Sequence, residues 1–282
     1  MAADRSDWLQ RKQTAEKDAD KQTVDLAKKE LAQIESDQER IRNESILVNL
    51  IVEDDAKSAR QLFVDVADNA LGVPKAVRSR FDQTKVANRA LYDILTNPPE
   101  VLKNRVDDQK DRVTGKNPNL IGAGNLSEII RTLEVGISGR INKKLEASVS
   151  ETHLVNQTND FFKALTDAFV ELQHVADGTM STEALRDNSL LGSSTMLRIL
   201  AGVYHEISQT HGKAAAASFM SKLAPHMSAP IDKATTSGQL WINCGSTEAF
   251  IDGGRAPGAR SQQVKDAVTS IAAWIDNPPI EL

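Results

Sequence analysis

The chain has 282 residues, of which 40% are hydrophobic, and its formal net charge is −5. This composition supports a full hydrophobic core and excludes a wholly disordered chain, while the acidic balance excludes a basic nucleic-acid coat but not a local basic face. No apolar run approaches the roughly 20 residues needed to cross a bilayer, and the charged N-terminus carries no apolar signal region. The single cysteine, Cys244, excludes an internal disulfide. We therefore expect a cytoplasmic protein.

Residues 1–45 are more highly charged than the rest of the chain. They hold 9 Lys or Arg and 11 Asp or Glu, and they contain neither Gly nor Pro. Val24, Leu31, Ile34 and Ile41 follow one another at spacings of 7, 3 and 7 residues, which places them on one narrow helical stripe. We predict a charged arm of one or two long helices, which either packs as a hairpin or spacer on its own domain or dimerises as a coiled coil.

An apolar segment, residues 46–52, follows the arm and predicts a buried strand because it is rich in β-branched residues. Asp54 or Asp55 would then cap a helix whose apolar residues recur with a period of 3.6 and which stops at Gly72. The next stretch is basic, and phosphate groups are contacted by Lys and Arg side chains. We therefore predict a DNA-binding face formed by Lys75, Arg78, Arg80, Lys85 and Arg89.

The remainder of the chain is predicted to be largely helical. Residues 104–124 are rich in Gly, Pro and Asn and predict a loop with room for a short strand. A helix should begin at Asn125 or Ser127, and apolar periodicity predicts further helices over about 150–175, 192–210, 213–225 and 261–276. The expected fold is mainly α, of the α+β class, with a small, incomplete β element near residues 46–52. We expect three parts, which are the arm (1–45), a β-α segment with the basic stretch (46–135) and a helical domain (136–282).

Motifs that would carry catalysis are largely absent from the sequence. His205 and Glu206 resemble the start of a zinc-binding helix, but position 209, where a second histidine would complete that motif, is Gln. Cys244 lies among apolar residues with no histidine near it in sequence, which is typical of a core cysteine. Without a convergent acid, base and nucleophile, we expect no enzymatic activity, no cofactor and no metal site.

Two further features are candidates for binding phosphate. The run Gly122-Ala123-Gly124-Asn125 precedes a predicted helix, where backbone N–H groups can bind an anion. The alternative is a loop that ends in an Asn cap. A second basic group could equally be ordinary solvated surface, and it comprises Arg131, Arg140, Lys143 and Lys144.

The region from residue 45 to residue 95 resembles the DGQHR-domain family, which includes DndB-like proteins of DNA sulfur modification. The resemblance rests on an apolar strand, a helix with a Gln-x-Phe-x-Asp core, and a basic stretch that ends in an aromatic residue followed by aspartate. In this sequence these residues are Gln61, Phe63 and Asp65, then Phe81 and Asp82. The resemblance continues in the same order through residues 105–133, 190–207 and 258–275.

This resemblance implies a role beside DNA in a phosphorothioation-type modification system, with DNA binding and negative control of transcription, and it implies relatives in phages and mobile elements. Gln61 and Asp65 would fix their helix to the neighbouring strand. The family's Asp-Gly-Gln-His-Arg motif is absent from this sequence. In relatives that motif lies upstream of the segment that resembles residues 1–45. The chain is therefore expected to correspond to the C-terminal two-thirds of such a protein.

Two functional hypotheses follow from the sequence. The first is a DNA-associated accessory or regulatory protein that binds DNA through its basic face with modest affinity. The alternative is a protein-interaction scaffold or non-catalytic fragment, in which residues 1–45 bind a protein partner or a second copy of the chain. A third hypothesis, an enzyme that uses a nucleotide, is opposed by the missing motif.

Overall fold

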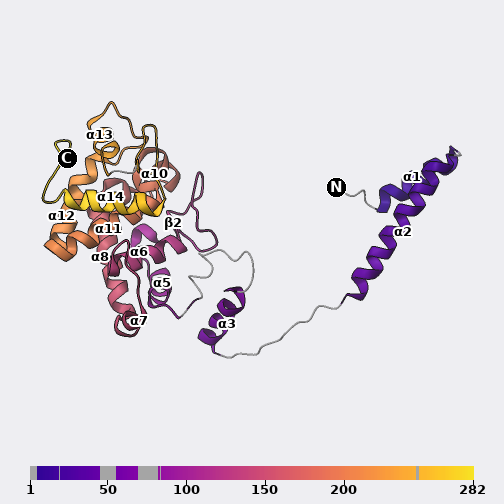
Figure 1. Ribbon diagram of the computed structural model, residues 1–282, viewed down its shortest axis with the longest axis horizontal. Coiled ribbons are helices and arrows are strands. Elements are labelled where there is room, and N and C mark those ends of the chain that lie inside the picture. Colours follow the sequence, from indigo (N-terminus) through magenta and orange to yellow (C-terminus); the bar gives the residue numbers. More distant parts are fainter. Residues whose placement is uncertain (1–4, 19, 45–54, 69–81, 83, 246–247) are drawn as a thin grey trace. The chain divides into compact units, whose positions relative to one another are not determined.

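The computed structural model describes residues 5–18, 20–44, 55–68, 82, 84–245 and 248–282. The chain divides into two compact units, Met1–Val52 and Glu53–Leu282. The predicted strand at 46–52 lies outside the described residues. Where the described residues form elements, these are mostly helices, together with one two-stranded parallel sheet, so the expectation of a mainly α fold with a small β element is confirmed (Figure 1).

The first unit contains two helices that contact each other, α1 (Arg5–Lys17) and α2 (Lys21–Asn43). Asp20 begins α2 because its side chain accepts hydrogen bonds from the backbone N–H groups of Gln22 and Thr23. Among the described residues of the two helices, the buried apolar side chains are those of Ala15, Ala27 and Leu31. The contact between the two helices is therefore a narrow seam along highly charged helices.

The second unit begins with α3 (Ala56–Asp68), which Asp55 caps by accepting a hydrogen bond of 2.8 Å from Ser58 N. The next helix, α5 (Val86–Thr96), begins at Lys85, and the carboxylate of Glu146 accepts from Val86 N at 2.7 Å. A carboxylate that is distant in sequence thus takes the place of the local cap.

The two strands of this unit lie between α5 and α6 along the chain. Strand β1 (Val106–Asp107) pairs in parallel with β2 (Ile121–Gly122), and β2 leads directly into α6 (Ala123–Val135). The helix therefore begins two residues before the earlier of the two predicted starts. Asn125 is not its cap, because the N-cap residue is Gly122.

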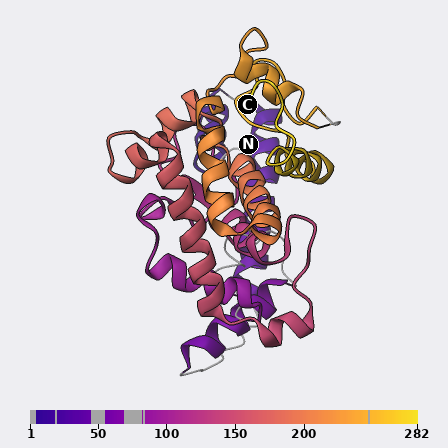
Figure 2. The ribbon, with the colours of Figure 1, turned by 90° about the vertical axis from the view of Figure 1, so that its left-hand side faces the viewer.

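The body of the second unit is a set of packed helices (Figures 1 and 2). The long ones are α8 (Glu151–Ala168), α11 (Ser194–His211), α12 (Lys213–Leu223) and α14 (Ser261–Ala273). The shorter elements are α7 (Lys143–Ser148), α9 (Val170–Ala176), α10 (Thr182–Asn188), α13 (Thr236–Ile242) and the 3₁₀ turns η1 (Glu100–Leu102), η2 (Leu190–Gly192) and η3 (Ala224–His226).

The single helix predicted for residues 150–175 is wrong, because the structure has two helices separated at Phe169. Phe169 adopts an extended backbone with φ −113° and ψ 109°. Its ring is fully buried, whereas Val170 is exposed. Burial of the aromatic ring outweighs the loss of helical continuity at this position, since a phenylalanine contributes roughly 1.5–3 kcal/mol when it is fully buried.

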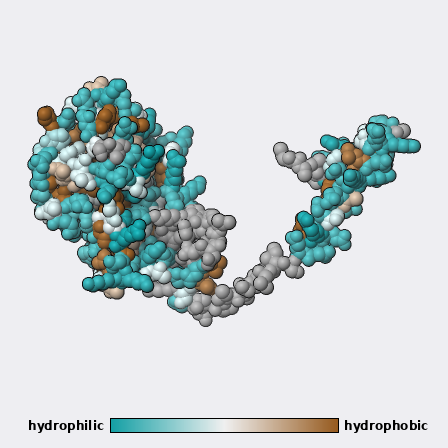
Figure 3. All heavy atoms as spheres, in the orientation of Figure 1, coloured by the Kyte–Doolittle hydropathy of each residue, from teal (hydrophilic) through white to brown (hydrophobic). Residues whose placement is uncertain are grey.

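Helix α11 contacts α6, α12 and α14 and therefore lies at the centre of the core. One apolar cluster extends from Val86 to Ile271 and includes residues on both sides of position 135. Aromatic contacts join α8 to α11, where the rings of Phe161 and Tyr204 lie 5.5 Å apart. The outer face in view is mostly hydrophilic, with scattered apolar residues (Figure 3). The core thus fixes the first turns of α6 and α11 next to the loops of residues 111–115 and 255–259.

Candidate functional site

The predicted basic face is described only in part. Lys75, Arg78 and Arg80 lie outside the described residues. Lys85 is exposed and forms an ion pair of 3.1 Å with Asp82. Arg89 donates from Nε to Glu151 Oε1 at 2.6 Å, and this contact joins α5 to α8. Both ion pairs would compete with a phosphate contact at these two side chains.

The motif residues taken from the family resemblance are also placed only in part. Gln61 donates a hydrogen bond of 2.9 Å to Asp65 within α3. Phe63 lies on the same helix with its side chain outside the described residues, and Phe81 is not described. Asp82 is buried; burial disfavours its charged form, but hydrogen bonds from Thr84 and Lys85 outweigh this and hold the pKa below its ordinary value. Asp82 therefore orders the entry to α5.

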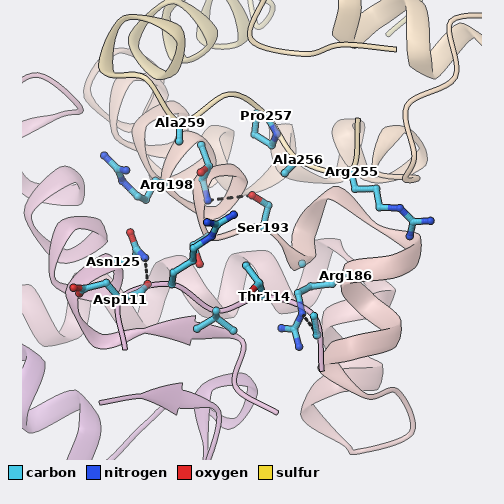
Figure 4. Close-up of a pocket in the computed structure, with 16 residues that line it drawn as sticks. Asp111, Thr114, Asn125, Arg186, Ser193, Arg198, Arg255, Ala256, Pro257 and Ala259 are labelled. Carbon is cyan, nitrogen blue, oxygen red and sulfur yellow. Dashed lines mark hydrogen bonds between the residues drawn. The ribbon is translucent and has the colours of Figure 1, made fainter. Parts of the chain in front are cut away.

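A cavity of about 560 Å³ opens in the second unit among segments that are distant in sequence (Figure 4). Its walls are the loop of residues 111–115, the first turns of α6 and α11, one side chain of α10 and the loop of residues 255–259. This volume falls within the range of pockets that hold small-molecule ligands.

The cavity carries an excess of positive charge. Four arginines and one aspartate line it, which gives a net charge of +3 in a chain whose formal charge is −5. In Figure 4, Arg198, Asn125 and Asp111 lie at one end of the cavity, and Arg186 and Arg255 lie at the other. The fourth arginine is Arg112, which is exposed.

Arg198 has the most unusual environment of the four arginines. Its Nε is buried and has no hydrogen-bond partner among the described residues. Burial lowers the pKa of its guanidinium, and the positive charge of Arg131 acts in the same direction, whereas Glu128 partly opposes them. Asp111 Oδ1, at the same end of the cavity, is likewise buried without a partner among the described residues. An unpaired buried polar atom costs free energy, and neither side chain forms a hydrogen bond or ion pair through its other atoms among the described residues.

A second cavity of about 540 Å³ shares Arg198 with the first. Its charged lining residues are Arg131, Arg140, Arg198 and Lys265 against Glu128, again a net charge of +3. Arg140 and Lys265 are exposed. Two members of the second basic group recognised in the sequence, Arg131 and Arg140, thus meet Arg198 in the fold. We call the seven basic residues of the two cavities the arginine face, and they are Arg112, Arg131, Arg140, Arg186, Arg198, Arg255 and Lys265.

Arg186 shapes the first cavity. Its guanidinium donates to Gly115 O at 3.0 Å, to Asn119 O at 2.9 Å, to Asn117 O and to the Thr182 hydroxyl. The loop of residues 114–119 is thereby held against α10. Burial lowers the pKa of Arg186, although the charges of Glu183 and Asp187 oppose the shift.

The loop that contains Asp111 is held by the start of α6. Asn125 Nδ2 donates to Asp111 O at 2.8 Å (Figure 4). A Cβ atom at Gly122 would lie 2.6 Å from Lys110 O and 2.7 Å from Asp111 O, so only glycine permits this close approach. The Gly-Ala-Gly-Asn run therefore positions the cavity wall.

Other expected features have structural explanations. Cys244 is buried, and burial raises the pKa of its thiol to about 12. Nδ1 of His205 lies 2.7 Å from Leu133 O. Among the described residues no group of His, Cys, Asp and Glu is arranged to bind a metal ion. In the same part of the chain, no helix combines the length and apolarity required to cross a membrane.

Residues 26–245 match a protein family described as DndB, DNA-sulfur modification-associated. The chain belongs to the DndB family. No curated protein and no solved structure matches it. The family resemblance noted in the sequence is therefore confirmed, and it connects the chain with DNA sulfur modification.

Sequence reasoning did not find the first cavity as a site. Arg112, Arg186, Arg198 and Arg255 are separated by 12 to 74 positions, so no local cluster marks them. One signal was present, since Arg198 interrupts the otherwise apolar run Met196–Leu200 at the centre of a predicted helix. A lone arginine within such a run indicates a charge held at the core boundary.

Proposed function

We propose that this chain is a DNA-associated accessory or regulatory protein of a DNA sulfur modification system. The observation that supports this function best is the arginine face, where two adjoining cavities with a net charge of +3 each share Arg198. Membership of the DndB family supports the connection with DNA sulfur modification.

The proposed contact is electrostatic. Lysines and arginines that contact phosphates release condensed counterions, and this release drives binding without reading the base sequence. The acidic balance of the whole chain opposes binding at other surfaces, so the contact is local and its affinity is modest. Occupancy of the duplex would then exclude other proteins from it, and this exclusion would be the means of regulating transcription.

Fluorescence anisotropy of a labelled duplex, titrated with the full chain at several salt concentrations, tests this proposal. The test variant is Arg140→Gln with Lys265→Gln, which removes two exposed charges from the arginine face. The control is Lys163→Gln with Lys222→Gln, which removes two exposed charges from α8 and α12. The logarithmic salt slope should fall by about 0.9 for each lost contact in the test variant and stay unchanged in the control.

The absence of saturable binding by the full chain at low salt would refute DNA contact by this chain. Equal slopes in the test and control variants would refute the arginine face as the contact. The basic stretch is compared directly by Arg78→Gln with Arg80→Gln. If that variant alone lowers the slope, the DNA contact lies in the basic stretch at Lys75, Arg78, Arg80, Lys85 and Arg89, as proposed from the sequence.

The first unit supports a second candidate function, which is protein interaction. Leu26 is 51% exposed and Ile41 is 63% exposed, and both lie on α2. These apolar side chains could contact a partner helix or a second copy of the chain. Deletion of residues 1–43 should then lower the number of chains per particle measured by light scattering or abolish partner capture. An unchanged number of chains together with unchanged capture would refute this function.

A further inference from the structure

We infer that the first cavity is a binding site for a nucleotide, with the phosphate held by Arg198 and Arg112. This inference goes beyond the proposed contact with duplex DNA. A duplex presents its phosphates on a convex surface, whereas this cavity of about 560 Å³ lies between five segments of the chain and is large enough for a small molecule.

The charges of the cavity favour an anion. Four arginines face one aspartate, so a dianionic phosphate would leave the lining close to neutral. Not all four are available to a ligand, however. Arg186 already donates to three loop carbonyls, and Arg255 donates to Asp187. Arg112 is exposed and, like Arg198, forms no hydrogen bond or ion pair among the described residues.

The unpaired atoms specify more than a bare anion. Arg198 supplies donors and Asp111 supplies acceptors, neither side chain forms a hydrogen bond or ion pair among the described residues, and both lie at the same end of the cavity (Figure 4). A ligand that satisfies both must itself carry an acceptor and a donor. A nucleotide does so, since its phosphate accepts and its sugar hydroxyl or base amino group donates.

The remaining lining residues fit the other parts of a nucleotide. Val113, Ala256, Pro257 and Ala259 supply apolar surface for the base or sugar. None of the described residues that line the cavity is aromatic, so these residues offer the base no stacking contact. The first turn of α11 adds the positive end of its dipole. Its N–H groups at Thr195 and Met196 are already bonded to Ser193 Oγ, and the arginine side chains therefore make the phosphate contacts.

The nucleotide could come from two sources, either free nucleoside monophosphate or the 5′-terminal nucleotide of a DNA strand. Both present the same phosphate monoester. The apolar lining and the unpaired carboxylate oxygen predict that nucleoside monophosphate binds more tightly than inorganic phosphate, and the arginines predict that the nucleoside alone does not bind.

Isothermal titration calorimetry of the full chain tests the inference, with deoxyadenosine monophosphate, inorganic phosphate and deoxyadenosine as the three probes. One site for the monophosphate is expected, with phosphate weaker and deoxyadenosine without measurable binding. Arg112→Gln should weaken binding of the monophosphate by about tenfold, as expected for the loss of a charge-assisted hydrogen bond. Because Arg112 is exposed, this variant should fold normally. Arg198→Gln should have at least the same effect.

The matched control is Arg140→Gln with Lys265→Gln, whose side chains line only the second cavity. It should bind the monophosphate as the unaltered chain does. Equal weakening in Arg112→Gln and in this control would overturn the inference, and so would the absence of binding at millimolar monophosphate. Tighter binding of inorganic phosphate than of the monophosphate would also overturn it.

Competition then distinguishes the two sources. Displacement of the monophosphate by a 5′-phosphorylated oligonucleotide, but not by its 5′-hydroxyl counterpart, would support the strand end as the source. Displacement by neither would support the free nucleotide. The result is separable from the duplex titration through Arg140→Gln with Lys265→Gln, which should lower the salt slope of duplex binding and leave the affinity for the monophosphate unchanged, whereas Arg112 belongs to the arginine face and its loss can affect both.

Discussion

Replacement of Arg186 by alanine should destabilise the second unit more than replacement of any other arginine in the first cavity. The side chain holds the loop of residues 114–119 through three carbonyl groups and the Thr182 hydroxyl. Hydrogen bonds to a charged group contribute about 1.5–3 kcal/mol each when their partners are buried. These carbonyls are partly exposed, so water replaces some of the lost bonds, and the expected loss is about 2–4 kcal/mol in total.

Urea unfolding of the full chain, followed by tryptophan fluorescence, measures this loss, because the ring of Trp241 is buried in the second unit. Arg255→Ala is the matched control. Arg255 pairs with Asp187 at 3.1 Å, but its side chain is 54% exposed, so its loss should cost no more than about 0.5 kcal/mol. Equal losses in the two variants would refute the argument that Arg186 holds the loop. Binding of nucleotide should weaken in Arg186→Ala as well, because the loop is a wall of the cavity.

Three further predictions concern the second unit. Burial disfavours the charged form of Asp107, but hydrogen bonds from Asn117 and two backbone N–H groups outweigh this and lower its pKa from 3.8. The carboxylate therefore contributes its full stabilisation above pH 3.8, and this stabilisation is lost as the pH falls through the lowered pKa. The urea midpoint should therefore fall less between about pH 5 and pH 2.5 in Asp107→Asn than in the unaltered chain. Cys244 should react with a thiol reagent only in denaturant, and fast reaction of the folded chain at pH 8 would contradict its burial. Gly202→Ala should lower the free energy of unfolding by about 1–3 kcal/mol, because a Cβ there would lie 2.7 Å from Val268 Cγ2; a stabilised variant would show that helix propensity dominates instead.

The local pattern of residues determined most of the helices. Helix α3 is capped by Asp55, one of the two predicted caps, and α14 lies within the helix predicted over about 261–276. These elements are predictable because a cap and a helical face depend on residues within a few positions of one another. The break at Phe169 was not predictable in this way. It depends on a buried site for the aromatic ring that other helices provide.

The candidate site was decided by the tertiary structure. The sequence identified the basic stretch at residues 75–89 because its charges are adjacent, and it identified the DndB resemblance because motif order is a property of the chain. It could not show that Arg112, Arg198 and Arg255 meet in one cavity, since no short-range pattern encodes contacts across so many residues. Packing of α11 against α6 and α14 places Arg198 between two cavities. The sequence thus determines how many charged residues the chain has, whereas the fold determines which of them lie together in one site.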